Sequence, residues 1–134
     1  MSERICWKDK LRANPIPWLL EPDTSQPAVR YFTLCDLIDH SDDEVEVKEA
    51  RAAIMLSGPV PVILAAQEPE GYWDKPGAGY GPKYRGTQWA VVFMVQLGAD
   101  GADLRVRAAC EYVLSHSIAS PMFLPEKGKN SRME

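Results

Sequence analysis

Between residues 68 and 89 the chain gathers aromatic and basic side chains of the kinds that line binding sites. The segment 68–86 reads EPEGYWDKPGAGYGPKYRG, and its many Gly and Pro residues mark it as a loop. Long loops often carry function, and aromatic side chains with a few polar groups commonly surround a ligand. An alternative is that these rings only seal the end of a helical layer. The candidate ligand-binding residues are Tyr72, Trp73, Tyr80, Tyr84, Arg85 and Trp89.

Two Cys–His pairs could suggest a metal site, but their spacing does not favour one. Cys35 and His40 are five residues apart and Cys110 and His116 are six apart, so neither pair places two ligands on one helix face. The densest acidic cluster, 42–44, stands where a helix is expected to begin, and there the helix dipole explains it. The sequence therefore predicts no metal.

The glycine-rich string GAGYG at 77–81 invites comparison with a phosphate-binding loop. It lacks both the preceding strand and the Lys-Ser/Thr ending that such a loop needs, so we interpret it as a flexible turn. A G-x-S-x-G nucleophile motif is also missing from the sequence. We expect no catalytic residue and no cofactor.

Composition and charge exclude several classes of protein. The chain has 134 residues with 46% hydrophobic and 25% charged residues, as in ordinary globular proteins. A net charge of −4 with no basic run argues against nucleic acid as a partner. Its apolar stretches are far shorter than the roughly 20 residues of a membrane span, and its first residues do not form a signal peptide. We expect a cytoplasmic protein.

Hydrophobic periodicity predicts an all-α protein, with hardly any strand signal. In 41–56, the apolar stripe of Val47, Ala50 and Ile54 indicates a surface helix, and Ser41 to Glu44 has the form of a capping box. A weakly helical segment is expected over 2–14 and an extended one over 15–27. Helices are expected over 27–38, 41–56, 60–67, 87–97 and 104–117.

The expected helix 87–97 is apolar almost all round, and we therefore predict that it is buried on every side. Thr87 is the expected cap of its beginning, and Gly98 marks its end. Amphipathic helices alternate twice with almost wholly apolar ones, which predicts antiparallel helical hairpins stacked in two layers. We expect one α-helical repeat domain over 1–118, which includes an N-terminal extension (1–26), followed by a flexible tail over 119–134.

The most specific local pattern is a Q-x-x-x-G-x-W string formed by Gln67, Gly71 and Trp73. It resembles the QW motif of the squalene-hopene cyclase and prenyltransferase superfamily, whose α/α toroids use it as a structural clasp. The resemblance covers 14–118, and it extends to proteins similar to squalene cyclases whose role is unassigned. It implies that the Gln amide satisfies backbone groups at a helix end, that Gly allows a tight turn and that Trp packs over the amide.

The resemblance does not extend to the chemistry of that superfamily. Its cyclases use a D-x-D-D acid and its protein prenyltransferases a zinc site, and this sequence has neither pattern. We therefore expect a non-catalytic domain that binds an isoprenoid or another apolar small molecule. The alternatives are a protein-interaction scaffold and a glycan-binding surface on the aromatic loop.

The number of helices suggests an association with further helices. A toroid of this superfamily has about six inner and six outer helices, whereas the sequence predicts only five. An uncovered apolar face normally finds a partner, and two-fold self-contact is the commonest solution. We expect a homodimer that buries 104–124 or the apolar helix at Val91 to Leu97, or else further toroid repeats.

Overall fold

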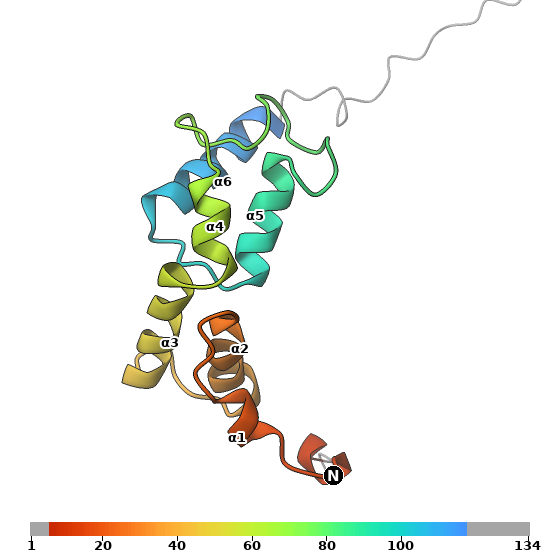
Figure 1. The fold of residues 1–134 in the computed structure, drawn as a ribbon, viewed down its shortest axis with the longest axis vertical. Coiled ribbons are helices and arrows are strands. Elements are labelled where there is room, and N and C mark those ends of the chain that lie inside the picture. Colours follow the sequence, from red (N-terminus) through yellow and green to blue (C-terminus); the bar gives the residue numbers. More distant parts are fainter. Residues whose placement is uncertain (1–5, 118–134) are drawn as a thin grey trace, which may run out of the picture. The chain divides into compact units, whose positions relative to one another are not determined.

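The computed structural model describes residues 6–117, and this part of the chain is built from helices and their connections, without a strand (Figure 1). The prediction of an all-α fold is confirmed. The predicted tail 119–134 lies outside the described residues. The chain divides into two compact units, Met1–Pro61 and Val62–Glu134. The single repeat domain and the toroidal stacking of its hairpins stay predictions.

The first unit begins with two short helical turns. A 3₁₀ turn, Trp7–Lys10, stands where we expected a weak helix. Helix α1, Ile16–Leu19, stands where we expected extended chain, so that prediction was wrong. The turn forms because the Asn14 side-chain oxygen accepts a hydrogen bond (3.1 Å) from the backbone N–H of Ile16. Pro17 then fixes a helical φ in the first turn.

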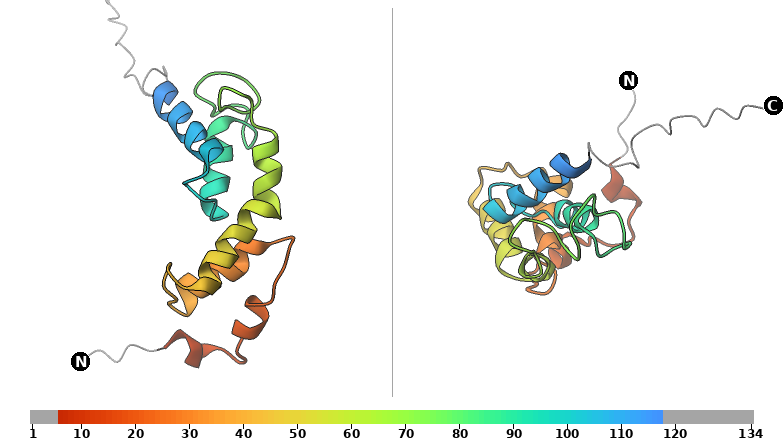
Figure 2. Two further views of the ribbon diagram at one scale, coloured as in Figure 1. Left: turned by 90° about the vertical axis from the view of Figure 1, so that its left-hand side faces the viewer. Right: turned by 90° about the horizontal axis from the view of Figure 1, so that it is seen from above.

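Helices α2 (Pro27–Phe32) and α3 (Val45–Leu56) pack together and form the core of the first unit (Figure 2). The predicted stripe on α3 is confirmed, because Val47, Ala50 and Ile54 are all buried. Leu34 joins Val47 and Ala50 in one cluster. Partly buried side chains complete this cluster: Leu20, Tyr31, Cys35 and Ile38.

Helix α2 continues into a π-helical turn, Thr33–Leu37, in which the Ile38 N–H donates to the Thr33 carbonyl oxygen (3.2 Å). The chain then turns at Asp39, which has a φ of 55°. The His40 N–H reaches back to the Leu34 carbonyl (2.9 Å). These bonds satisfy carbonyls that the helix end leaves without an intrahelical partner.

The predicted capping box forms only in part, one turn ahead of its helix, because the Ser41 hydroxyl accepts from the Asp43 N–H (3.4 Å) and not from that of Glu44. The Ser41 N–H donates to Glu44 Oε1 (2.9 Å), as a capping box requires. Helix α3 nevertheless begins only at Val45. The other Glu44 oxygen, Oε2, lies 2.7 Å from His40 Nδ1, so this carboxylate ties together the connection that precedes the helix.

Helix α4, Pro59–Ala65, leads into the second unit, which holds α5 (Thr87–Gln96) and α6 (Leu104–Ser117). Figures 1 and 2 show these three helices running in alternating directions. Gly98 has a φ of 75°, and the next N–H, of Ala99, donates to Met94 O (2.9 Å), so the predicted glycine end of α5 is confirmed. The buried residues of this unit include Leu64, Trp73, Thr87, Ala90, Met94, Val106 and Ala109.

Burial of α5 on every side was a wrong prediction. Ala90 and Met94 face the core, whereas Val92 is 44% and Val95 68% exposed. A helix that is apolar all round does not reveal which side its neighbours cover. None of the helices in residues 6–117 has the length and apolar character that a bilayer crossing requires.

Asp103 immediately precedes α6, and its charge gives a testable pH dependence. Its carboxylate accepts from the Arg105 backbone N–H (2.8 Å) and pairs with the Arg105 guanidinium (2.8 Å). The Arg105 side-chain bond is the main reason that the Asp103 pKa falls from 3.8 to about 2. A carboxyl whose pKa is lowered on folding stabilises the fold at high pH. This contribution is complete above about pH 4 and is lost between about pH 4 and 2.

We expect Asp103→Asn, which keeps a side-chain oxygen for the cap, to be less stable than the wild type at pH 7. The two proteins should approach equal stability as the pH falls through about 2. Thermal melts followed by circular dichroism between pH 7 and 2 measure this, with Glu111→Gln, an exposed site on α6, as the control. A difference between wild type and Asp103→Asn that does not change with pH would contradict the assignment.

Candidate functional site

Trp73 joins two helices of the second unit. Its indole Nε1–H donates to the carbonyl of Ile63 in α4 (2.7 Å), and its backbone N–H donates to the hydroxyl of Thr87 (3.0 Å). The side chain is only 5% exposed. The prediction that Thr87 caps α5 was wrong, because Gly86 is the cap residue and Thr87 is the first residue within the helix. Its hydroxyl serves Trp73 instead.

Gln67 and Gly71 add α6 to this arrangement. The Gln67 Nε2 amide donates to the Gly71 carbonyl (3.3 Å) and to the Arg105 carbonyl (3.0 Å). Gly71 has a φ of 101°, and a Cβ there would lie 3.0 Å from the backbone oxygen of Ala108. Only glycine permits both this φ and this close approach. We call Gln67, Gly71, Trp73 and Thr87 the clasp, since they connect α4, α5 and α6.

The glycine-rich segment 77–80 is fastened to the helices by a series of hydrogen bonds. The sequence predicts a flexible turn over 77–81, and within it each of residues 77–80 bonds to a side chain or backbone group of α5 or α6. One of the bonds also satisfies an N–H of the first turn of α5, which has no side-chain cap. The bonds run from Gly77 N to Tyr112 Oη (2.9 Å), from Gln88 Nε2 to Ala78 O (2.6 Å), from Gln88 N to Gly79 O (3.2 Å) and from Trp89 Nε1 to Tyr80 O (2.9 Å).

Three of the candidate ligand-binding residues form an aromatic group centred on Trp89. The Trp89 ring lies 5.6 Å from that of Tyr80 and 4.8 Å from that of Tyr84. Tyr80 is 46% and Tyr84 59% exposed. The ammonium of Lys83 lies 4.9 Å from the centre of the Tyr84 ring, in a cation–π contact. We call Tyr80, Tyr84 and Trp89 the aromatic group.

Tyr84 has a φ of 67°, in the left-handed region. A large side chain in this region is a genuine outlier, and such a conformation costs on the order of 1 kcal/mol or more. Glycine would avoid this cost. A tyrosine that is strained and also largely exposed indicates that its ring is needed for something other than the turn.

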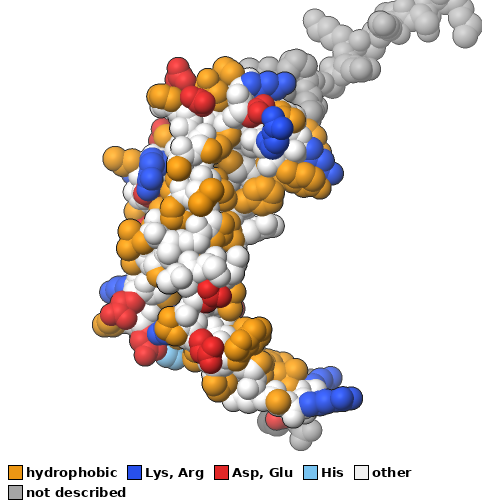
Figure 3. Space-filling view, in the orientation of Figure 1, with side chains coloured by type: hydrophobic (Ala, Val, Ile, Leu, Met, Phe, Trp, Pro, Cys, Tyr) orange, Lys and Arg blue, Asp and Glu red, His pale blue; other side chains and the backbone are white. Residues whose placement is uncertain are grey.

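Arg85 lies beside this group, and its guanidinium pairs with Asp74 at 3.0 Å. The Arg85 side chain is 73% exposed, so the pair adds little to stability. Hydrophobic and basic side chains lie side by side over the loop that precedes α5 (Figure 3).

The apolar surface continues along α5. Trp89, Val92 and Val95 follow at three-residue spacing, so they lie along one side of the helix. We call the aromatic group together with Val92 and Val95 the apolar strip. The two valines were not among the candidate site residues. Their signal in the sequence was weak because every position of this helix is apolar or uncharged.

The six candidate ligand-binding residues therefore do not form one continuous site. Trp73 belongs to the clasp and is buried. Tyr72 packs against Tyr112, with ring centres 5.4 Å apart, and the Tyr112 ring in turn stacks on His116 at 3.9 Å. Tyr112 was also missed by sequence reasoning, since it lies 40 residues beyond Tyr72.

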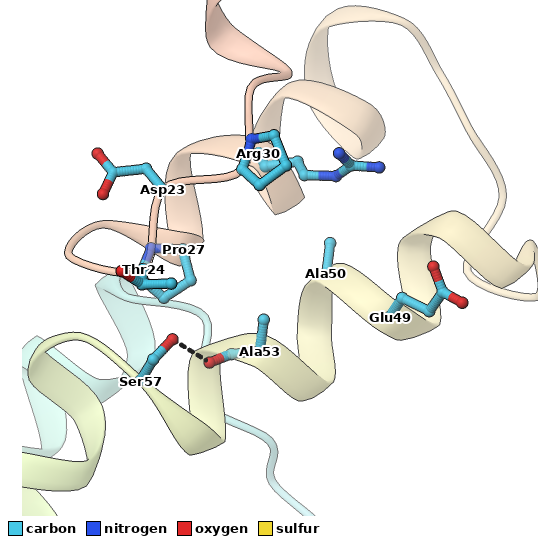
Figure 4. A pocket seen from close by; sticks show the side chains of 9 residues that line it. Asp23, Thr24, Pro27, Arg30, Glu49, Ala50, Ala53 and Ser57 are labelled. Atoms are coloured by element: carbon cyan, nitrogen blue, oxygen red, sulfur yellow. Dashed lines mark hydrogen bonds between the residues drawn. The ribbon is translucent and has the colours of Figure 1, made fainter.

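Three pockets in residues 6–117 are lined by residues outside the apolar strip. Two lie in the first unit, with volumes of about 260 and 520 Å³, and one of about 280 Å³ lies beside the clasp. In the 260 Å³ pocket, Ala50 and Ala53 point toward the segment at Pro27 (Figure 4).

The polar groups around the 260 Å³ pocket serve the fold. Arg30 donates to the Leu20 carbonyl (3.0 Å). Asp23 accepts from the Ser25 hydroxyl and backbone (2.6 and 2.8 Å), and these bonds lower the Asp23 pKa. Within residues 6–117, no three His, Cys, Asp or Glu side chains are grouped so that they could hold a metal ion.

The chain was compared with protein-family models, with curated proteins and with solved structures, and none of the three comparisons finds a match.

We expect Trp73→Ala to destabilise the protein by roughly 3 to 5 kcal/mol, as large aromatic truncations in a core do. The control is Trp18→Ala, because Trp18 is 70% exposed. Urea unfolding followed by circular dichroism measures both variants. Equal stability of the two variants would show that Trp73 is not a central packing residue.

A second prediction concerns the hydroxyl of Thr87. Thr87→Val removes the acceptor of the Trp73 N–H and leaves this buried donor unsatisfied, at a cost of about 1 to 3 kcal/mol. The exchange of the Trp73 amide proton, followed by NMR, should become faster. Thr87→Ser keeps the oxygen and should keep the slow exchange. Similar exchange rates in both variants would contradict the role of this bond.

Proposed function

We propose that the chain is a non-catalytic binding module and that it holds a hydrophobic helix of a protein partner on the apolar strip. The observation that carries this proposal is Tyr84, a tyrosine with a φ of 67° whose side chain is 59% exposed. Strained residues of this kind are found where the strain serves a function. In an isolated helical repeat without a partner, glycine would serve this turn better.

The composition of the strip suits recognition of a protein. Tyr, Trp and Arg dominate the energetics of protein interfaces, and Tyr80, Tyr84, Arg85 and Trp89 supply all three types here. Lys83 and Arg85 are engaged with a ring and with Asp74. This arrangement favours positioning and recognition over proton transfer, in keeping with a module that is not an enzyme.

The shape of the surface favours a helix over a small molecule. Pockets for small ligands usually enclose 70–90% of the ligand surface, whereas Tyr84 and Val95 are 59% and 68% exposed. A glycan platform is favoured less, because the ring planes of Tyr80 and Tyr84 are inclined to that of Trp89 by 43° and 61°. A sugar ring would stack on a flatter surface.

An isoprenoid remains the second candidate ligand. It is favoured by the absence of charge over the whole of Thr87–Leu97, along which a hydrocarbon chain would meet no charged side chain. The resemblance of the Q-x-x-x-G-x-W string to the terpenoid cyclase and prenyltransferase repeats points to the same class. In this alternative the same strip binds farnesyl-like chains.

Tyr84→Gly separates the binding role from the structural one. Glycine adopts a positive φ without strain, so we expect the melting temperature to stay unchanged or to rise. Binding should weaken at least fivefold. The probes are an uncharged Leu/Ala/Gln helical peptide and farnesol, each titrated while the Val92 and Val95 methyl signals are followed by NMR.

The matched control is Trp18→Gly, at an exposed aromatic residue of the first unit, which should leave peptide binding unchanged. Shifts with farnesol but not with the peptide would favour the isoprenoid candidate. If neither probe shifts the valine signals, the strip is not a binding surface.

A further inference from the structure

We propose that the helix held by the apolar strip is α5 of a second copy of this chain, packed antiparallel about a two-fold axis near Val92. This inference rests on the proposed function, because it takes the strip as the binding surface and names the partner. It is carried by two properties of α5: its lack of charge, and a polarity pattern that is symmetric about Val92.

The lack of charge restricts what can cover the helix. Over Thr87–Leu97 there is no Asp, Glu, Lys or Arg, a length of about 15 Å at 1.5 Å per residue. A charged partner helix would lose hydration against this face without gaining an ion pair. The best partner is therefore itself uncharged over about three turns, and α5 of a second copy has this property.

Two other exposed apolar side chains lie near charges. Val45 is 69% exposed, but acidic residues precede and follow it at Glu44 and Glu46. On α6, Leu104 is 79% exposed and lies next to Arg105. Two copies meeting face to face at either place would bring like charges together. Of the two regions expected to form a dimer, α5 is therefore favoured over α6, and residues 118–124 of the other region lie outside the described part of the chain.

The pattern of α5 is also self-complementary. Three and four residues before Val92 stand Trp89 and Gln88, and three and four residues after it stand Val95 and Gln96. In an antiparallel pair with its axis at Val92, Trp89 therefore faces Val95 of the second copy, and this contact occurs twice, as a two-fold interface requires. The small valine side chain leaves room for the large indole.

The glutamines fit the same arrangement. Gln88 faces Gln96 of the second copy, and an amide side chain both donates and accepts hydrogen bonds. Gln88 Nε2 already donates to Ala78 O (2.6 Å). The pairing accordingly uses Gln88 Oε1 as the acceptor and Gln96 of the second copy as the donor. This hydrogen bond would fix the register of the two helices.

The expected strength of the contact follows from its size. A stable interface buries about 800 Å² on each partner, which one helical face of three turns does not supply. Tyr80 and Tyr84, whose rings pack at an angle against Trp89, enlarge the contact beside the helix. We therefore expect self-association with a dissociation constant on the order of micromolar, within the range of weak interfaces.

Sedimentation equilibrium between 1 and 200 µM tests whether the partner is a second copy of the chain. The wild type should pass from the 15.0 kDa monomer to a dimer of twice that mass. Val92→Glu brings two carboxylates together at the axis and should weaken dimerisation more than tenfold. The matched control, Val45→Glu at a valine of the first unit that is 69% exposed, should dimerise like the wild type. Circular dichroism checks that both variants fold.

Disulfide cross-linking tests the antiparallel register. On a background with Cys6→Ser, Cys35→Ala and Cys110→Ala, cysteine is placed either at position 92 or at position 96. Position 96 is four residues, about 6 Å, from the axis, so its two copies lie about 12 Å apart along an antiparallel pair. A disulfide spans at most about 7 Å between Cα atoms. We expect Val92→Cys to form a disulfide between the two copies and Gln96→Cys to form none.

Other results would contradict the register, the α5 interface or the second copy as partner. Cross-linking at both positions would mean a parallel pair. A wild type that stays monomeric at 200 µM, or an equal loss of dimer in Val92→Glu and Val45→Glu, would exclude the α5 interface. If the wild type is monomeric and still binds the helical peptide, the second copy is wrong while the proposed function stands. If the wild type is monomeric and binds neither the peptide nor farnesol, the second-copy proposal and the proposed function are both wrong.

Discussion

The two hydrogen bonds of Trp73 are the interaction on which the second unit depends. The indole bonds to α4 at Ile63 and the backbone amide bonds to α5 at Thr87. One residue thus joins two helices at positions that are 24 residues apart in sequence. Gln67 extends the connection to α6 through the Arg105 carbonyl. Because the two bonds of Trp73 are buried or partly buried, the loss of either one leaves a polar atom without water to replace its partner.

The exposed surface follows from this buried arrangement. Fixing Thr87 sets the beginning of α5, and the first turn of α5 then binds the returning loop through Gln88 and Trp89. Ala90 and Met94 turn toward the core and Val92 and Val95 away from it. The apolar strip is thus the outer side of the helix whose inner side the clasp holds in place.

Periodicity and turn residues predicted most of the fold. The helices over 27–38, 41–56 and 104–117 have one-sided apolar stripes or clear ends, and those signals are local. The errors have a common cause, since they depend on partners that periodicity does not reveal. The helical turn α1 depends on the side chain of Asn14, and the role of Thr87 depends on Trp73, 14 residues earlier.

The candidate site was predicted less completely for the same reason. The sequence placed five aromatic and basic residues in one loop and Trp89 in the helix that follows, and their types indicated binding. It did not reveal that Trp73 points inward while Tyr84 points outward, because a loop has no period that separates its two faces. The valines of α5 were missed because a uniformly apolar helix gives no sign of its exposed side.

The hydrogen bonds that order residues 77–80 also affect how tightly a partner is bound. Ordering the backbone of one residue on association costs about 1 to 2 kcal/mol of conformational entropy, and these residues are already ordered by bonds to α5 and α6. A preorganised surface keeps most of the contact energy as affinity. Loosening this loop would therefore weaken the binding of a partner, even where no contact residue is changed.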